Sequence, residues 1–273
     1  MSVELSVNYS LEAVKLLRER RISFDRLKCP DWPDLIAEAK KHLPVYVHFP
    51  LDAGSTSGRS PDFARALAMA DETETPPINI HLVTWQRDFP EYAADSDDPR
   101  LRQQVIDRMI ADVSAAASII PRERLILENI PYFGARGEFH RASVEADVIR
   151  HVVEETNTGF LLDLSHARIA AHYLGVEPHA YVESLPVGRL RELHVTGVRM
   201  INDRLADHME LRYEDWAWTQ WAFDRIKSGA WPTPWTVALE YGGIGEPFKW
   251  RSEEAAIAAM VPRLHEMIRT GDK

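Results

Sequence analysis

The sequence predicts an α/β fold in which eight parallel strands and their helices form a (β/α)8 barrel. Short apolar runs recur eight times along the 273 residues, and segments with the spacing of amphipathic helices separate them. Regular alternation of strand and helix is typical of a parallel sheet, and barrels of this length can form one domain. We therefore expect a single domain over residues 1–273. An open, doubly wound sheet is the alternative, but no Gly-x-Gly-x-x-Gly motif follows the first strand.

The apolar runs are the expected strands, because each is short and bounded by polar or turn-forming residues. They comprise residues 3–8, 23–29, 44–49, 77–83, 124–129, 159–163, 190–195 and 235–241. The segments between them repeat apolar residues every three or four positions, which predicts helices with one buried face. Examples are residues 11–20, 32–42, 61–71, 100–118, 143–155, 214–228 and 253–269.

The composition is that of an ordinary globular protein, with 45% hydrophobic and 27% charged residues. A net charge of −10 argues against a broad nucleic-acid surface, because duplex binding depends on clustered Lys and Arg. No apolar run approaches the roughly 20 residues of a membrane span. The first residues, MSVELSVNYS, lack the basic and apolar regions of a signal peptide. We expect a cytoplasmic protein that binds neither nucleic acid nor membranes.

The chain contains one cysteine, Cys29, and therefore no internal disulfide. It lies at the end of an expected strand of mixed apolar and polar residues. We expect a buried structural thiol there rather than a nucleophile.

Acidic and imidazole side chains stand at the carboxyl ends of six consecutive expected strands. They are His48, His81, Glu128, Asp163, His194 and Glu240. Any one of them has a simple structural explanation, such as a helix cap or a hydrogen-bonded core histidine. In a barrel, however, these strand ends surround one mouth, which is where barrel enzymes have their active sites. Carboxylates buried face to face repel one another unless protons or cations neutralise them, so bound metal ions are the simplest explanation.

Further candidate ligands follow the sixth and seventh strands. In the stretch LDLSHARIAAH, His166 comes one helical turn after Asp163 and returns to the same side. His172 lies six residues further on, and the sequence favours neither a role near the site nor a place on the helix surface. Asp207 and His208 belong to an expected loop after the seventh strand. Carboxylates and imidazoles without cysteine suit iron, manganese or zinc, and this many ligands indicates two or three ions.

These residues resemble those of a known superfamily. The order His, His, Glu, Asp-x-x-His, His, Asp/His, Glu is similar to that of the xylose isomerase-like TIM barrels, which include the apurinic endonucleases with their three-metal site. Residues 162–197, LDLSHARIAAHYLGVEPHAYVESLPVGRLRELHVTG, resemble more narrowly the multinuclear non-haem iron-dependent oxidases, long known only as a domain of unknown function. IHLVTW, LILENIPYF and VALEY are similar to further elements of that family, and the resemblance spans about residues 44–241.

The resemblance implies a set of metal ligands in this chain. They are His48, His81, Glu128, Asp163, His194 and Glu240, with Asp207 and His208 in addition. Two positions depart from the oxidase pattern. The family commonly has Asn after the aspartate of the sixth strand, where this chain has Ser165 and His166, and its Asp-x-His pair is an adjacent Asp-His pair here.

The same resemblance implies an oxidase that activates dioxygen at mixed-valent iron. Members of that family modify residues, often Cys, of a ribosomally made peptide held by a partner protein. The alternative is a sugar or hydroxy-acid isomerase or epimerase, in which divalent ions polarise a carbonyl group, and the Asp-x-x-His pair favours it. A phosphodiester hydrolase is a weaker alternative, given the acidic charge. A catalytically inactive barrel that only binds a peptide or small molecule fits poorly with a complete ligand ring.

Four other features have both a structural and a functional interpretation. Trp216, Trp218 and Trp221 lie in an expected helix, where packing against the barrel is favoured over peptide docking. The loop at 52–62, with possible hinges at Gly54 and Gly58, is a candidate lid.

Arg59 and Arg199 lie in loops on the mouth side of the expected barrel. Either can hold a substrate carboxylate or phosphate, or serve only as surface charge. Asn129 follows Glu128 directly and is expected to orient a ligand residue by hydrogen bonding.

Overall fold

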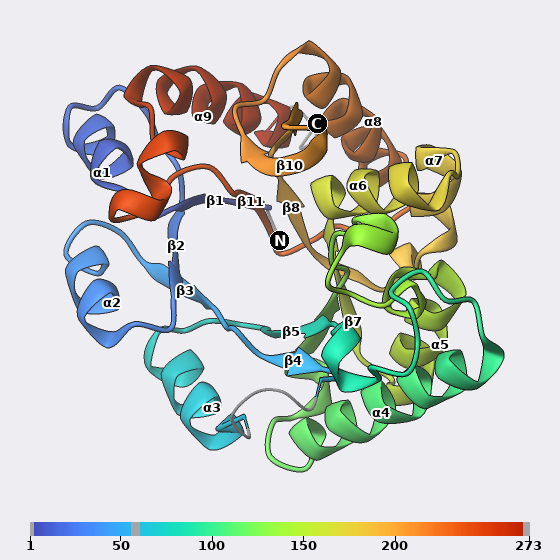
Figure 1. Ribbon diagram of the computed structural model, residues 1–273. Coiled ribbons are helices and arrows are strands. Elements are labelled where there is room, and N and C mark those ends of the chain that lie inside the picture. The colour runs from blue at the N-terminus through green and yellow to red at the C-terminus, as the bar shows by residue number, and fades with distance from the viewer. Residues whose placement is uncertain (1–2, 56–60, 270–273) are drawn as a thin grey trace.

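The computed structural model describes residues 3–55 and 61–269, without the side chains of residues 247 and 249. Its parallel strands are β1 (Glu4–Asn8), β2 (Arg26–Pro30), β3 (Val45–His48), β4 (Asp52–Ala53), β5 (Ile78–Leu82), β6 (Leu125–Glu128), β7 (Gly159–Asp163), β8 (Leu190–Val195) and β11 (Thr236–Leu239). They form one sheet in the order β3-β2-β1-β11-β8-β7-β6-β5-β4. Because β3 and β4 are consecutive pieces of one barrel strand, the sheet returns on itself (Figure 1). The predicted (β/α)8 barrel is confirmed.

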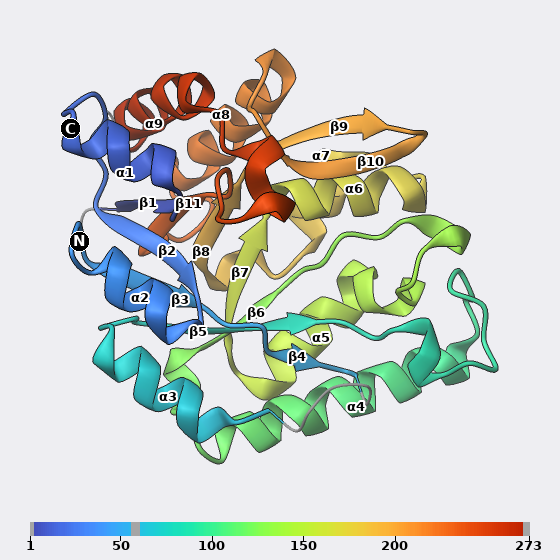
Figure 2. The ribbon, with the colours of Figure 1, turned by 60° about the vertical axis from the view of Figure 1, so that its left-hand side comes forward.

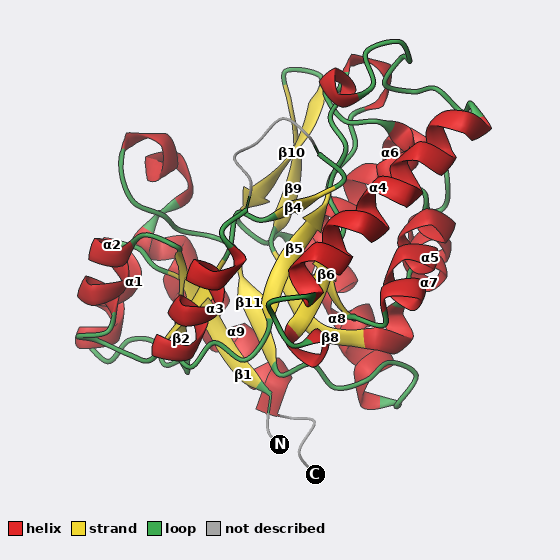
Figure 3. Cartoon of the chain, turned by 90° about the horizontal axis from the view of Figure 1, so that it is seen from below, coloured by secondary structure: helices red, strands yellow, loops and turns green. Residues whose placement is uncertain are grey.

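Helices form an outer ring around the strands (Figures 1 and 3). They are α1 (Leu11–Arg18), α2 (Pro33–Ala39), α3 (Phe63–Glu72), α4 (Pro99–Ala117), α5 (Ala146–Thr156), α6 (Leu164–Leu174), α7 (Pro178–Ser184), α8 (Tyr213–Lys227) and α9 (Glu254–Arg269). Short 3-10 helices lie at Gln86–Asp88, Arg122–Arg124, Gly134–Arg136, Arg141–Val144, Val187–Arg189 and Glu246–Arg251. Proline begins α2, α4 and α7, where its missing N–H costs nothing. In the described residues, no helix is both long and apolar enough to cross a bilayer.

Helix α6 gives only a weak pattern in the sequence. It begins directly after β7, and its buried face is built from Ser165, Ala167, Ala170 and Ala171 together with larger residues. Small side chains allow the helix to pack closely against the sheet, but they do not stand out as an apolar stripe. For this reason α6 is expected from the position of His166, one helical turn after Asp163, rather than from an apolar stripe.

An antiparallel hairpin of β9 (Gly197–Ile201) and β10 (Arg204–Met209) follows β8 and extends beyond the barrel (Figure 2). The expectation of a loop here is wrong. Asn202 and Asp203 at its tip have φ angles of 49° and 61°, the left-handed conformation that two-residue hairpin turns require. Between Ala206 and Met209 the pairing shifts by one residue, which makes a β-bulge.

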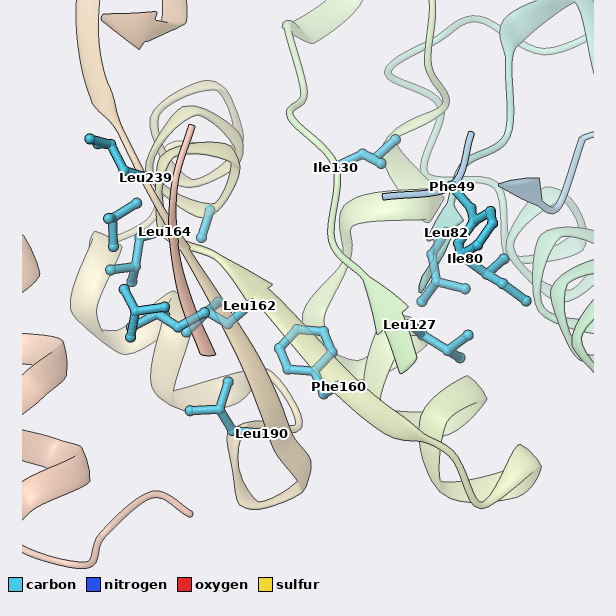
Figure 4. Close-up of a cluster of buried hydrophobic side chains, with 14 of the residues drawn as sticks. Phe49, Ile80, Leu82, Leu127, Ile130, Phe160, Leu162, Leu164, Leu190 and Leu239 are labelled. Carbon is cyan, nitrogen blue, oxygen red and sulfur yellow. The ribbon is translucent and has the colours of Figure 1, made fainter. Parts of the chain in front are cut away.

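The hydrophobic core lies between the sheet and the helices. Alternate strand residues, including Ile80, Leu127, Phe160 and Leu162, belong to a continuous buried cluster with the helices (Figure 4). The other residues of each strand point into the barrel, because side chains alternate along a strand. Several of these inward residues are polar and buried. They include Ser6, Lys28, Asn79, Glu192 and Thr236.

A side chain closes the barrel between β3 and β5. The backbone N–H of Phe49 donates to Asn79 Oδ1 at 2.7 Å, and Asn79 Nδ2 donates to the Phe49 carbonyl at 3.0 Å. Beyond this point, backbone hydrogen bonds join Leu51 and Ala53 to the strand β5 segment. The Asn79 side chain therefore replaces the backbone hydrogen bonds of a neighbouring strand where the third barrel strand is interrupted.

Replacing Asn79 with Ala should lower the free energy of unfolding by about 2–4 kcal/mol, because it leaves a buried N–H and a buried C=O of Phe49 without partners. Urea denaturation of the chelator-treated protein measures this change without a contribution from bound ions. The control is Gln103→Ala, which removes an exposed amide on α4 and should change stability by less than about 0.5 kcal/mol. Equal effects of the two substitutions would contradict the closing role of Asn79.

Candidate metal centre

The six strand-end side chains meet at one mouth of the barrel. The parallel register places His81 opposite Glu128, and Asp163 opposite His194. His81 Nε2 lies 3.2 Å from Glu128 Oε2 and 3.3 Å from the Nε2 atom of His48. His194 Nδ1 lies 3.2 Å from Glu240 Oε1 and 3.9 Å from Asp163 Oδ2. The ring expected from the strand ends is therefore present as a cluster of side chains.

Backbone carbonyl groups orient three of the histidines. Each donates from Nδ1 to a carbonyl oxygen 2.9 or 3.0 Å away, which turns Nε2 toward the cluster. The pairs are His81 with Leu51, His166 with Asn129, and His208 with Glu240. An imidazole held in this orientation can bind a cation through Nε2 once that nitrogen carries no proton.

His194 is turned the other way by a buried carboxylate. Its Nε2 donates to Glu192 Oε1 at 2.8 Å, and the second Glu192 oxygen accepts from Trp235 Nε1 at 3.0 Å. The remaining nitrogen, Nδ1, faces the cluster. Burial and Lys28 would lower the pKa of His194, but Glu240 and Glu192 raise it to about 9.

Asp163 serves both as a helix cap and as a member of the cluster. Its Oδ1 accepts from the backbone N–H groups of Ser165 and His166, at 2.8 and 2.7 Å, and so caps α6. Its Oδ2 is buried and accepts no hydrogen bond. Asn129, as expected, orients this residue by two 2.9 Å hydrogen bonds to the Asp163 backbone. Burial raises the pKa of the carboxyl group to about 7, against the effect of nearby histidines.

The β-bulge brings both Asp207 and His208 to the centre. His208 has a φ of 57°, so two adjacent side chains lie on the same side instead of alternating. Asp207 Oδ2 lies 3.1 Å from His166 Nε2, and its other oxygen lies 3.8 Å from His208 Nε2. Burial would raise the pKa of Asp207, but the hydrogen bond from His166 lowers it to about 2.

These donors fit metal ions. Overlapping sets among the described residues have donor atoms within 4.8 Å of one another. They are His48–Glu192–His194, His48–His81–Glu128, Glu128–Asp163–His194 and Asp163–His166–Glu240. Burial lowers the pKa of His48 well below its usual value, which keeps its imidazole neutral and able to bind. The Oδ2 of Asp163 suits a cation best, because a buried carboxylate oxygen without a hydrogen-bond donor is costly.

Some expected residues lie away from the centre. His172 is exposed on α6 and packs edge-on against Tyr173. Arg199 does not face the mouth as a free cation, because its guanidinium is 2.6 Å from the buried Asp215 carboxylate. Trp218 and Trp221 stack with ring centres 5.0 Å apart, and Trp218 is buried, which confirms packing as their role.

The middle of the candidate lid, residues 56–60 with Gly58 and Arg59, lies outside the described residues. Gly54 is described, with a φ of 105°, and a Cβ atom there would lie 2.7 Å from Thr84 Oγ1. A tight contact, rather than hinge motion, requires glycine at this position. Cys29 is free and buried, as expected, and burial raises the pKa of its thiol to about 12.

Two residues of the centre are absent from the sequence-based set. Lys28 points inward from β2, and its Nζ contacts Glu240 Oε1 and lies 3.4 Å from each ring nitrogen of His194. Glu192 fixes the ring of His194 by accepting the hydrogen bond from its Nε2. The available signal was alternation along each strand. Lys28 lies between the apolar residues Leu27 and Cys29, and Glu192 lies two residues before His194 and therefore on the same face.

A cavity of about 290 Å³ opens over the cluster. Its lining combines imidazole and carboxylate groups of the centre with apolar and aromatic side chains, which include Tyr9, Trp32, Leu35 and Phe248. Arg251 also lines the cavity, with a buried Nε that makes no hydrogen bond. A substrate in this space would lie between reactive groups and an aromatic surface.

A model of the family described as RiPP precursor modification enzyme MbnB/TglH/ChrH matches residues 29–233, which is more than half of the chain. The chain belongs to this family. The match includes every expected metal-centre residue except Glu240, which lies beyond the end of the match and directly follows β11. Family membership and the donor clusters support a metal-dependent barrel enzyme.

Curated relatives are distant. A UPF0276 protein of Rhizorhabdus wittichii is 26% identical over 60% of this chain and 58% of its own length. A UPF0276 protein of Anaeromyxobacter is 25% identical over 60% of this chain and 57% of its own length. The chain thus spans less than two thirds of these two relatives. A third, from Acaryochloris marina, is 24% identical over 72% of this chain and 71% of its own length.

Solved structures show the same xylose isomerase-like barrel. A D-psicose 3-epimerase from Clostridium cellulolyticum superposes with a TM-score of 0.57 at 12% identity, covering 98% of this chain and 99% of the epimerase. An AP endonuclease of family 2 from Brucella melitensis gives 0.57 at 18% identity, covering 96% and 99%. At such low identity the likeness concerns the fold alone.

Adding Fe²⁺, Mn²⁺ or Zn²⁺ without oxygen should raise the melting temperature of the metal-free protein by several degrees, because a cation neutralises the buried carboxylates. Asp163→Asn should lose most of this rise and, at pH 8, should melt higher than wild type when metal-free, since it carries no buried charge. Scanning fluorimetry with elemental analysis measures both effects. Asp107→Asn, on the exposed side of α4, is the control. An unchanged melting temperature after verified loading would count against the centre.

The metal-free protein should lose stability between pH 7 and 9. Burial would lower the pKa of His166, but Asp163 and Asp207 raise it well above 6.5, and that of His194 is about 9. A histidine with a raised pKa contributes stability below its unfolded value and loses it as the pH rises through the folded value. Melting temperatures of chelated protein at pH 7, 8 and 9 test this. His172→Gln should keep the slope and His194→Gln should reduce it; a flat wild-type profile would disprove the assignment.

Proposed function

We propose that this chain is an iron-dependent oxidase that modifies a residue of a ribosomally made peptide. The observation that carries the proposal is the buried cluster of histidine and carboxylate donors in a chain of the RiPP precursor modification family. Two or three ions of iron are the expected cofactor, with manganese or zinc as the alternatives. A small partner protein that presents the peptide is part of the proposal.

The protein's own residues would hold and shape the centre. His48, His81 and Glu128 would bind on one side, and Asp163, His166 and the bulge pair Asp207–His208 on the other. Iron bound there would supply the one-electron chemistry with dioxygen that amino-acid side chains lack. The carbonyl groups that fix the histidine tautomers keep each Nε2 aimed at the cluster without rearrangement.

The cavity above the centre would bind the peptide and exclude water. Tyr9, Trp32 and Phe248 offer an apolar surface for one side of a side chain or backbone segment. Arg251 stacks over Phe248, with 4.4 Å between its guanidinium carbon and the ring centre, and burial lowers its pKa. Its unused donor would hold a carbonyl or carboxylate oxygen of the substrate.

A divalent-metal isomerase or epimerase of sugars or hydroxy acids is the second candidate. The observation in its favour is the Asp163–His166 pair, in which the His166 ring lies within the cluster, 3.8 Å from Asp163 Oδ2. Such an enzyme polarises a carbonyl group and moves a proton, with no net oxidation.

Dependence on oxygen separates the two candidates. Iron-loaded protein mixed with a short Cys-containing peptide encoded beside its gene should consume dioxygen, and mass spectrometry should detect a changed peptide mass. The reaction should stop under nitrogen and with zinc in place of iron. Asp163→Asn should reduce the rate by about two or more orders of magnitude, because it removes an anionic donor, whereas Asp107→Asn should not. Full turnover of a ketohexose such as D-fructose under nitrogen, supported by manganese, would instead establish the epimerase.

A further inference from the structure

We propose that Lys28 is a built-in cation of this centre, and that its ammonium group fills the corner between His194 and Glu240, so that the centre takes two metal ions rather than three. The inference rests on the metal centre of the proposed function and adds a property to it. It concerns a residue that lies just outside the segment matched to the family.

The position of Lys28 is set by the barrel. It lies on β2, and its side chain extends past β1 to reach residues of β8 and β11's carboxyl end. The side chain is only 5% exposed. Nζ contacts Glu240 Oε1 and lies 3.4 Å from both ring nitrogens of His194. Among the described residues, the other ion pairs of these carboxylates involve histidines, so Lys28 brings a permanent positive charge to the group.

Lys28 and His194 meet at one oxygen atom of Glu240. The ammonium group contacts Glu240 Oε1, and His194 Nδ1 lies 3.2 Å from the same oxygen. The ammonium group therefore has a buried carboxylate as its partner. Glu192 turns the His194 ring so that Nδ1 faces the same corner. Three residues from three strands thus form a closed group that needs no added ion.

The remaining donors form two corners. The first contains His48, His81 and Glu128, and the second contains Asp163 and His166 with the second oxygen of Glu240 nearby. The two other sets, Glu128–Asp163–His194 and His48–Glu192–His194, both include His194, and the first shares both of its carboxylates with those corners.

A metal ion bound to His194 would lie close to the ammonium group. The bond from a divalent ion to an imidazole nitrogen is about 2.1 Å long, and Nζ is already 3.4 Å from that nitrogen. A dication and an ammonium group that both lie this close to one nitrogen atom repel each other strongly in a buried site. Lys28 therefore excludes the third ion, while Glu128 and Asp163 remain able to bridge the first two.

Metal content per chain tests the inference. Each protein is loaded with excess Mn²⁺ without oxygen, desalted and analysed by inductively coupled plasma mass spectrometry. We expect two ions in wild type and three in Lys28→Met, which keeps the length of the side chain but removes its charge. Lys40→Met, on a surface ion pair with Glu72, is the control and should hold two. Metal loading should also raise the melting temperature more in Lys28→Met than in wild type, because its Glu240 has lost its counter-charge.

A second variant keeps the inference testable if Lys28→Met does not fold. His194→Gln should retain two ions, since His194 serves the lysine corner, whereas a three-ion centre would lose one. Three ions in wild type, two in Lys28→Met, or one in His194→Gln would each overturn the inference and leave the metal centre intact. Wild-type protein that binds no ion after loading would instead contradict the proposed function.

Discussion

Burial of several carboxylates at one mouth of the barrel is the constraint on which the rest of the structure depends. Glu128, Asp163, Glu192 and Glu240 are each less than a tenth exposed, and Asp207 is close by. Negative charges this near to one another and this far from water are unstable alone. The neighbouring histidines and Lys28 stabilise these buried carboxylates, and hydrogen bonds to the ring nitrogens hold the histidines in place. The hydrophobic core between the sheet and the helices stabilises the barrel and so holds the strand ends at fixed spacing.

The register of the parallel strands determines where these groups lie. Parallel pairing places strand ends level with one another, so a residue at the end of one strand faces its counterpart on the next. Backbone carbonyl groups just beyond the strand ends then fix the histidine rings. In each of these histidine contacts one partner is a backbone group, whose position the fold fixes. The result is a centre whose donors are arranged before any ligand arrives.

The barrel and most of its centre could be predicted because both follow from short-range rules. Period-two alternation identifies His81, Glu128 and Asp163 as same-facing strand ends, and parallel strands bring such ends together. Features that depend on three-dimensional detail were not predictable in this way. The sequence marks Lys28 as an inward-facing charge, but it does not show that its side chain reaches the centre from β2 across an intervening strand. His172 is exposed because α6 starts directly at Leu164, so a residue six positions after His166 turns away from the mouth.

The double role of Asp163 links the chemistry of the mouth to the exterior of the protein. One oxygen begins α6 and the other faces the cluster, so electron withdrawal by a cation on one oxygen weakens the other as a hydrogen-bond acceptor for the first turn of the helix. Helix α6 in turn contacts α7 and the hairpin strands β9 and β10. The amide groups of Ser165 and His166 are thus natural reporters of occupancy. Through them, a cation bound to one buried oxygen atom changes the hydrogen bonds that begin a helix on the outside of the barrel.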